Sequence, residues 1–189
     1  MTLSLLIHLA DFIVMWSLPV LFFEKKDGRL NLQWFLTAMP FAVTPALWML
    51  VHLGYLAPLP LGSAVATALK AIGVALALAS IGLIAWTWRT HRVPLSLWHM
   101  ENDAPTSLVT SGPYAFIRHP FYTSFLLGIL GAACSAPHLF LVLTFGYAAV
   151  ILDRTAAREE ARLSTSQFGL EYRVYVQRTG RFVPWRTGR

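Results

Sequence analysis

Charged side chains are scarce in this sequence: Asp, Glu, Lys and Arg together make up 13% of its 189 residues, about half the share of an average soluble domain. Hydrophobic residues make up 56%, and many of them are gathered in runs long enough to cross a bilayer. This combination excludes a soluble globular domain. The sequence therefore predicts an all-α integral membrane protein.

Several kinds of chemistry lack their sequence signals. The one cysteine, Cys134, lies in an apolar run, which excludes an internal disulfide and favours a packing role. The six histidines show no paired metal-ligand spacing, so no metal site is expected. No phosphate-binding loop, dinucleotide-binding glycine pattern or Gly-x-Ser-x-Gly elbow is present. The net charge of +6 comes without a nucleic-acid-reading motif, so it predicts contact with membrane headgroups rather than nucleic acid.

The hydrophobic segments predict about five transmembrane helices in a single domain, 1–189. In chain order they are residues 3–23, 30–56, 63–88 and the two halves of 121–152. Because no basic region or cleavage site marks a signal peptide, the first is predicted as a retained helix. Pro40 and Pro45 predict a kink in the second. The block 121–152 is too short for two full spans, so its central turn predicts a hairpin of two short or tilted helices.

Basic residues predict the orientation in the membrane. They lie in the first loop, in the third loop and, as eight arginines between Arg154 and Arg189, in the tail, whereas the second and fourth loops have none. Cytoplasmic loops carry the excess of Lys and Arg. With five spans, the third loop and the tail are therefore predicted to be cytoplasmic and the N-terminus outside.

A polar, turn-forming stretch in the third loop, residues 112–122, is the first candidate site. Pro120 suits the first turn of a helix, with His119 near its cap. Free backbone N–H groups and the positive end of the helix dipole would then lie beside Arg118 and favour an anion such as a carboxylate. Tyr122 follows His119 by three residues, so both can share one face of that turn.

A second polar cluster begins at Asp153. Arg154, Arg158 and Arg162 recur every four residues, which predicts a helical stripe. Glu159 and Glu160 are unexpected at an anionic membrane surface unless they bind something, such as the amine or sugar of a nucleotide-like cofactor. These residues predict a membrane enzyme with a cytoplasmic pocket built from the third loop and the helical tail.

The two clusters together resemble a known family. The residues that carry the resemblance are Leu108 to Tyr114, Arg118-His119-Pro120-Phe121-Tyr122, Glu159-Glu160, Leu163, Phe168-Gly169, Tyr172 and Tyr175. Their order and spacing resemble the isoprenylcysteine carboxyl methyltransferase family, in its short, prokaryote-like branch. The likeness runs from about His99 to Pro184. It implies a catalytic region in 89–189 and a location in a bacterial or archaeal inner membrane.

The resemblance implies S-adenosylmethionine as the methyl donor. The residues implied to bind it are His99, Thr106, Ser107, Leu108, Val109, Tyr114, Arg118, His119, Pro120, Phe121, Tyr122, Glu159 and Glu160. Arg154 and Arg178 are implied as catalytic residues that orient the carboxylate of the acceptor. The implied partners are a lipophilic or lipidated acceptor and membrane lipids, whereas the oligomeric state cannot be predicted.

Alternatives to this assignment differ in substrate or in class. An isoprenylcysteine-like carboxylate is the first choice of acceptor, and a phospholipid amine is the second. Because an amine must be neutral to react, that reading predicts a nearby base, for which Glu160 is a candidate. A related sterol-reductase fold would use NADPH, and a membrane protein that only binds a lipid or ligand would not turn over.

Overall fold

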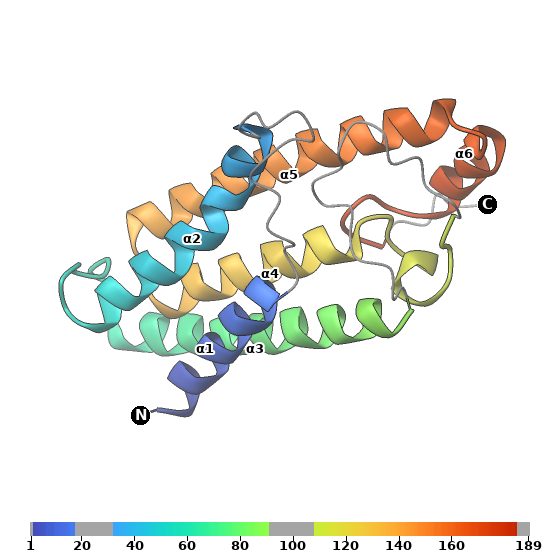
Figure 1. The fold of residues 1–189 in the computed structure, drawn as a ribbon. Helices are drawn as coiled ribbons and strands as arrows, with labels where there is room; N and C mark the ends of the chain where they lie inside the picture. The colour runs from blue at the N-terminus through green and yellow to red at the C-terminus, as the bar shows by residue number, and fades with distance from the viewer. Residues whose placement is uncertain (1, 18–31, 91–107, 185–189) are drawn as a thin grey trace.

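A computed structural model describes residues 2–17, 32–90 and 108–184 of the chain (Figure 1). Its helices are α1 (Leu3–Ser17), α2 (Leu32–His52), α3 (Ser63–Thr90), the short 3-10 helix η1 (Gly112–Ala115), α4 (Pro120–Ser135), α5 (Leu139–Thr165) and α6 (Gly169–Arg178). Over these ranges no β-strand occurs, and one isolated bridge joins Ile117 to Gly180. The prediction of an all-α protein is confirmed for this part of the chain.

Three of the helices are long and apolar enough to cross a membrane: α2 between Phe35 and His52, α3, and α5. The helices α1 and α4 are apolar but shorter. Each predicted hydrophobic segment thus contains a helix, and the chain is a membrane protein. The number of complete spans, like the predicted orientation, stays a prediction.

The predicted hairpin differs from the observed one in its second helix. The helix α4 has 16 residues, as expected of a short helix, but α5 has 27 and continues past Leu152 to Thr165. Between Tyr147 and Thr165 there is no glycine or proline to end the helix, and alanine, arginine and glutamate favour its continuation. One rigid helix therefore joins the membrane region to the charged tail.

The helix α4 lies in the centre of the bundle, in contact with α1, α2, α3 and α5 (Figure 1). Its closest neighbour is α3, and glycines permit that approach: a Cβ atom on Gly73 would lie 2.6 Å from the carbonyl oxygen of Gly131. Phe125 and Ile129 of α4 are fully buried in the core. Such small-residue contacts are typical of helices packed in a membrane.

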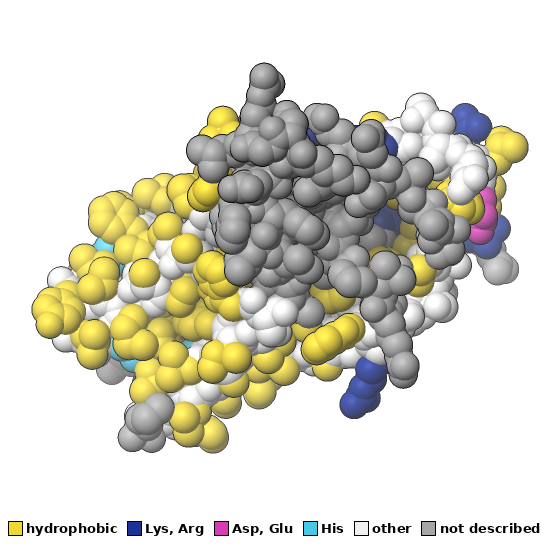
Figure 2. Space-filling model, in the orientation of Figure 1, with side chains coloured by type: hydrophobic (Ala, Val, Ile, Leu, Met, Phe, Trp, Pro, Cys, Tyr) yellow, Lys and Arg dark blue, Asp and Glu magenta, His cyan; other side chains and the backbone are white. Residues whose placement is uncertain are grey.

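The two ends of the bundle differ in character. Hydrophobic side chains cover much of the end near the α2–α3 connection, whereas basic side chains gather toward α6 at the opposite end (Figure 2). The α6 end is also where the third loop meets the tail. The amides of Arg118 and His119 donate to the carbonyls of Gly180 (2.8 Å) and Arg181 (3.1 Å). The tail is thereby fixed beside the start of α4.

Candidate functional site

The start of α4 has the predicted local structure. The helix begins at Pro120, and His119 is its N-cap residue. Proline is favoured in the first turn because its missing N–H has no intrahelical partner to lose. This start places His119 and Tyr122 on one face, where their rings are parallel, with centroids 5.3 Å apart. That face is turned toward α5, at the turn that carries Glu159 and Glu160.

Glu160 is the centre of an ion-pair network. One carboxylate oxygen, Oε1, accepts hydrogen bonds from Arg118 Nε at 2.9 Å and Arg181 Nε at 3.2 Å, and it lies 3.2 Å from His119 Nε2. The other oxygen accepts from a terminal nitrogen of Arg181 at 2.8 Å. Arg181 also binds Asp153 at 2.6 Å. The network joins the third loop, α5 and the tail.

Arg118 has further partners in the tail. Its guanidinium also donates to the backbone carbonyls of Val176 and Thr179, at the end of α6. Its amide and that of His119 are bonded to the tail, as described above. These two amides are therefore occupied by carbonyl acceptors of the folded tail. The predicted anion contact at the free N–H groups in the first turn of α4 stays a prediction.

Glu159 has a different environment although it is the next residue. Its carboxylate accepts a 2.6 Å hydrogen bond from the hydroxyl of Tyr122, and its second oxygen lies 3.5 Å from His119 Nδ1. The described residues place no arginine in an ion pair with it. A largely buried carboxylate loses its hydration, and here few protein contacts replace it. Its burial therefore costs folding free energy unless the group is protonated or a ligand supplies a positive or hydrogen-bonding group.

The electrostatics of the two glutamates are opposite. Both lie beyond the apolar part of α5, which ends at Leu152. Burial raises the pKa of Glu159 to about 7, partly opposed by the Tyr122 hydrogen bond. Burial would also raise the pKa of Glu160, but hydrogen bonds from His119, Arg181 and Arg118 outweigh it and hold that pKa well below its usual range.

His119 links the two carboxylates. Burial lowers its pKa, against the opposing effect of Glu160, so the neutral imidazole is favoured. A neutral ring has only one N–H to donate, and the contact with Glu160 is the shorter of the two. The edge of Phe182 packs against the same ring, with centroids 6.0 Å apart. The aromatic rings of His119 and Tyr122 therefore lie beside the carboxylate of Glu159, and Phe182 extends this aromatic surface by packing on His119.

The structure brings together the core of the predicted cofactor site: Arg118, His119, Tyr122, Glu159 and Glu160. Tyr114 lies nearby in η1, where its carbonyl accepts a 2.7 Å hydrogen bond from Tyr175. Pro120 and Phe121 are buried, and Phe121 packs in the hydrophobic core. Leu108 and Val109 are half-buried in the loop before η1. His99, Thr106 and Ser107 lie outside the described residues. Cofactor binding by these residues stays a prediction.

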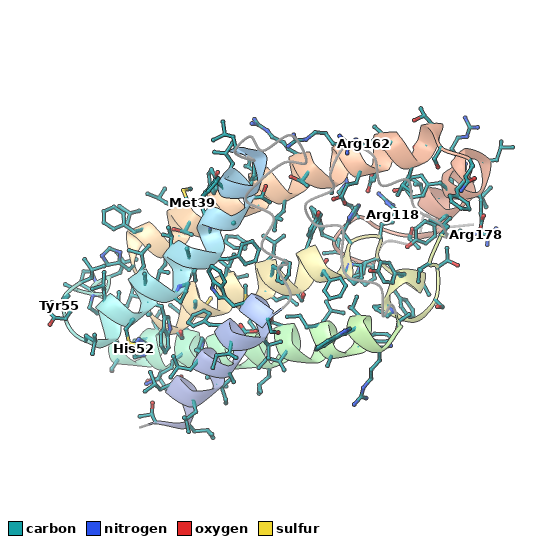
Figure 3. All side chains as sticks on the ribbon, in the orientation of Figure 1. Met39, His52, Tyr55, Arg118, Arg162 and Arg178 are labelled. Atoms are coloured by element: carbon teal, nitrogen blue, oxygen red, sulfur yellow. The ribbon has the colours of Figure 1, made fainter. Side chains whose placement is uncertain are left out.

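The two predicted catalytic arginines lie at the surface. Arg154 is exposed on α5. Arg178 is exposed at the end of α6, in the same region as Arg118 (Figure 3). In the described part of the chain neither guanidinium forms an ion pair. Both are thus available to an external anion, whereas Arg118 is bound within the protein.

Sequence reasoning missed Arg181 and Asp153. The unusual pair of acidic residues in a basic segment indicated that cationic partners were needed. Many arginines were available, however, and only the return of the tail to the start of α4 selects Arg181.

Among the residues with described positions, no three His, Cys, Asp or Glu side chains are grouped as metal ligands.

The fold and the site define an all-α membrane protein with a buried acidic and aromatic site at one end of its bundle. Residues 72–165 match the profile of the isoprenylcysteine carboxyl methyltransferase (ICMT) family. Both Glu159 and the start of α4 lie in this range. The chain belongs to this family, as the resemblance predicted. It is a methyltransferase family, which supports methyltransferase activity.

Two curated relatives match part of the chain. The cobalt-zinc-cadmium resistance protein CzcN of Cupriavidus metallidurans is 35% identical over 91 residues, which cover 47% of this chain and 42% of that protein. The nickel-cobalt-cadmium resistance protein NccN of Alcaligenes xylosoxydans xylosoxydans is 28% identical over 111 residues, which cover 59% of this chain and 52% of that protein. The chain thus spans about half the length of these relatives. No solved structure matches significantly.

Proposed function

We propose that the protein transfers a methyl group from S-adenosylmethionine to a lipophilic acceptor at the cytoplasmic surface of a membrane. The observation that carries the proposal is the largely buried Glu159 carboxylate, held by Tyr122 inside the region that matches a methyltransferase family. The names of the two relatives concern metal resistance in those proteins, and our proposal for this chain involves no metal substrate.

The chemistry of the site fits this donor. S-adenosylmethionine carries an ammonium group, ribose hydroxyls and a cationic sulfonium, all of which suit a carboxylate that has no close arginine ion pair among the described residues and only the longer-range influence of Arg158 and Arg162. Glu159 is such a carboxylate, whereas Glu160 is already neutralised by Arg118 and Arg181. The rings of His119 and Tyr122 supply apolar and hydrogen-bonding surface beside it. We therefore assign Glu159 to the donor and Glu160 to the support of the site.

The protein's own contribution is alignment and exclusion of water. When bound, the donor supplies an activated methyl group for an in-line displacement. Tyr122 and His119 fix the position of the Glu159 carboxylate, and the Glu160 network holds the loop and the tail around it. Alignment of two reactants in this way lowers a barrier by up to about 7–11 kcal/mol.

An isoprenylcysteine-like carboxylate is the acceptor that the described residues favour. A carboxylate is already ionised and needs a positive group to orient it, and Arg154 and Arg178 are exposed and without an ion pair in the described part of the chain. Glu160, the base that an amine acceptor was expected to need, has a pKa held well below its usual range by His119 and two arginines. It cannot take a proton at neutral pH.

A phospholipid amine is the second candidate. One observation favours it: burial raises the pKa of Glu159 to about 7, so this residue, rather than Glu160, could accept a proton from an ammonium headgroup near neutral pH. The two acceptors thus differ in whether Glu159 must change its protonation state during turnover.

Calorimetric titration of the purified protein with S-adenosylmethionine and with NADPH tests the class of cofactor. We expect the methyl donor alone to bind, and weaker binding in Glu159→Ala and His119→Ala. Glu171→Ala is the matched control, because Glu171 is an exposed acid on α6. No binding of the donor, or unchanged affinity in both site variants, would overturn the proposal.

Incubation with labelled donor then identifies the acceptor. N-acetyl-farnesylcysteine presents a prenylated carboxylate, and phosphatidylethanolamine presents an amine in a lipid headgroup. Label transferred to the first supports carboxyl methylation, and label transferred to the second supports N-methylation. Donor binding with transfer to neither contradicts both acceptors and favours a membrane protein that only binds its ligand.

A further inference from the structure

A second acid lies outside the candidate site, beside the middle of α4. Asp11 is near the middle of α1 and is 0% exposed. Neither of its carboxylate oxygens has a hydrogen-bond partner in the structure. Intramembrane acids are rare, and those that persist are usually paired or have a role. Asp11 has no cationic partner among the described residues, so its charge state needs an explanation.

The surroundings of Asp11 are built from three helices. A Cβ atom on Gly128 of α4 would lie 2.6 Å from Asp11 Oδ2, 2.7 Å from the sulfur of Met15 and 3.1 Å from Ser80 Oγ. The absence of a side chain at Gly128 therefore makes the room in which the carboxyl group lies. Ser80, on α3, is also 0% exposed, and its hydroxyl has no hydrogen-bond partner either.

The neighbouring histidine does not neutralise Asp11. His8 lies one turn earlier on α1, and its ring nitrogens contact the backbone carbonyls of Ser4 at 2.9 Å and Gly131 at 3.4 Å. Its ring also stacks on Trp48, with centroids 5.2 Å apart. No ion pair between His8 and Asp11 is formed. Around Gly128, the polar atoms that the described residues place nearest are an oxygen of Asp11 and the hydroxyl of Ser80.

An ionised carboxylate is not stable in such a place. Among the described residues it would have neither a cation nor a hydrogen-bond donor to compensate the loss of hydration, and a buried acid in that position is neutralised instead. One carboxyl group and one hydroxyl supply three oxygens, too few to replace the hydration shell of a metal cation. A proton needs only one acceptor besides the carboxyl group, and Ser80 Oγ, which lies with Asp11 Oδ2 beside Gly128, is the candidate for it.

We propose that Asp11 is a proton-binding site within the membrane bundle, and that its carboxyl proton, shared with Ser80, holds α1 against α3 and α4. The ligand of this site is the proton itself. Asp11 then forms a neutral interhelical hydrogen bond of the kind that joins helices in a bilayer. The inference stands on the packing of three helices and is independent of methyl transfer.

Infrared spectroscopy of the whole protein in lipid vesicles tests the proposal, because protonated and ionised carboxyl groups absorb in different regions. At neutral pH we expect the difference spectrum between the wild type and Asp11→Asn to show loss of a protonated-carboxyl band. Loss of a carboxylate band in its place would overturn the proposal. Glu171→Gln, which removes an exposed acid, is the control and should lose a carboxylate band.

Two further measurements keep the test independent of whether Asp11→Asn folds. In the wild type, isotopic labelling of aspartate should shift the protonated-carboxyl band, whereas labelling of glutamate should leave that component in place and so separate it from Glu159. Ser80→Ala should also shift the band, because its hydrogen bond is lost. An aspartate label without effect refutes proton binding, and an unshifted band in Ser80→Ala refutes the shared proton.

Discussion

Asp11 is a fully buried acid and Glu160 a largely buried one, yet their surroundings compensate the two carboxyl groups in opposite ways. At the polar end, Glu160 is held by two arginines and a histidine that come from the third loop and the tail. In the apolar part, Asp11 meets a glycine, a methionine and an unpaired serine hydroxyl. The first acid is stable as a carboxylate, whereas the second is stable only with a proton.

The comparison shows that burial alone does not determine what an acid does. A carboxylate with charged partners holds chain segments together but cannot bind a further cationic ligand or accept a proton. One with few partners, such as Glu159, keeps the capacity to do either. Within a single turn of α5 the protein therefore separates a structural acid from an acid that is available to a ligand.

The largest expected effect is that of Glu160→Gln. Removing this carboxylate leaves the largely buried Arg118 without its ion pair and releases Arg181 from the loop. Loss of one partner from a buried ion pair costs about 3–5 kcal/mol of unfolding free energy. Chemical unfolding in detergent measures it, with Glu171→Gln as the exposed control, expected within about 0.5 kcal/mol of the wild type. Equal stability of the two variants would show that the network is not structural.

The pH dependence of stability should separate Glu159 from Glu160. The pKa of Glu159 is raised from 4.5 to about 7, so its contribution is fully present below about 4.5 and is lost as pH rises through about 7. The pKa of Glu160 is lowered, so its contribution is present above about 4.5 and is lost as pH falls below that value. For Glu159 this shift corresponds to a change on the order of 3 kcal/mol.

Thermal unfolding of single variants across this pH range measures both contributions. Glu159→Gln should abolish the fall in stability between about pH 4.5 and 7, and Glu160→Gln should abolish the loss in acid. Parallel pH profiles for the two variants would contradict the opposite environments of Glu159 and Glu160.

In the apolar part, Gly128→Ala should disturb the contact with Asp11. The added Cβ would lie within 3.1 Å of Asp11, Met15 and Ser80, so these side chains must move. Overpacking of this kind costs about 1–3 kcal/mol. Gly82→Ala is the matched control on α3, because its Cβ would meet nothing within 4 Å. A thermal midpoint of Gly128→Ala equal to that of Gly82→Ala would show that this contact is not tight.

The smallest expected effect is that of Arg154→Ala on turnover. Its exposed side chain forms no ion pair within the described part of the chain, so stability and donor affinity should be unchanged. If Arg154 orients the carboxylate of the acceptor, kcat/KM for methyl transfer should fall about tenfold, a change of ~1.4 kcal/mol. Arg173→Ala, which removes another exposed arginine in the tail, should leave the rate unchanged. Equal rates in both variants would remove Arg154 from the reaction.

Much of the fold could be predicted from the sequence because its signals are local. Hydrophobic segments predicted the five apolar helices, and Pro120 predicted where α4 begins. The length of α5 was predicted less well, since the change from apolar to charged residues at Asp153 suggested a boundary that the backbone does not have. A change in polarity marks the edge of the membrane, but it does not end a helix unless a helix-breaking residue accompanies it.

Part of the candidate site could also be predicted, because its residues form two compact clusters in the sequence. The residues of the third loop and the pair of glutamates do meet in the structure. The roles of Glu159 and Glu160 could not be separated, and Arg181 was not recognised. These outcomes depend on which of many arginines returns to the start of α4. That choice is made by contacts between residues that are far apart in the sequence.

The sequence by itself determined the class of protein, the helices and the chemical groups available at one end of the bundle, since each follows from neighbouring residues. Only the tertiary structure decided the environment of each acid. Adjacent residues on a helix point about 100° apart, so Glu159 and Glu160 face different neighbours. The packing of α1, α3 and α4 likewise places Asp11 beside Gly128, Met15 and Ser80, with no cationic partner among the described residues.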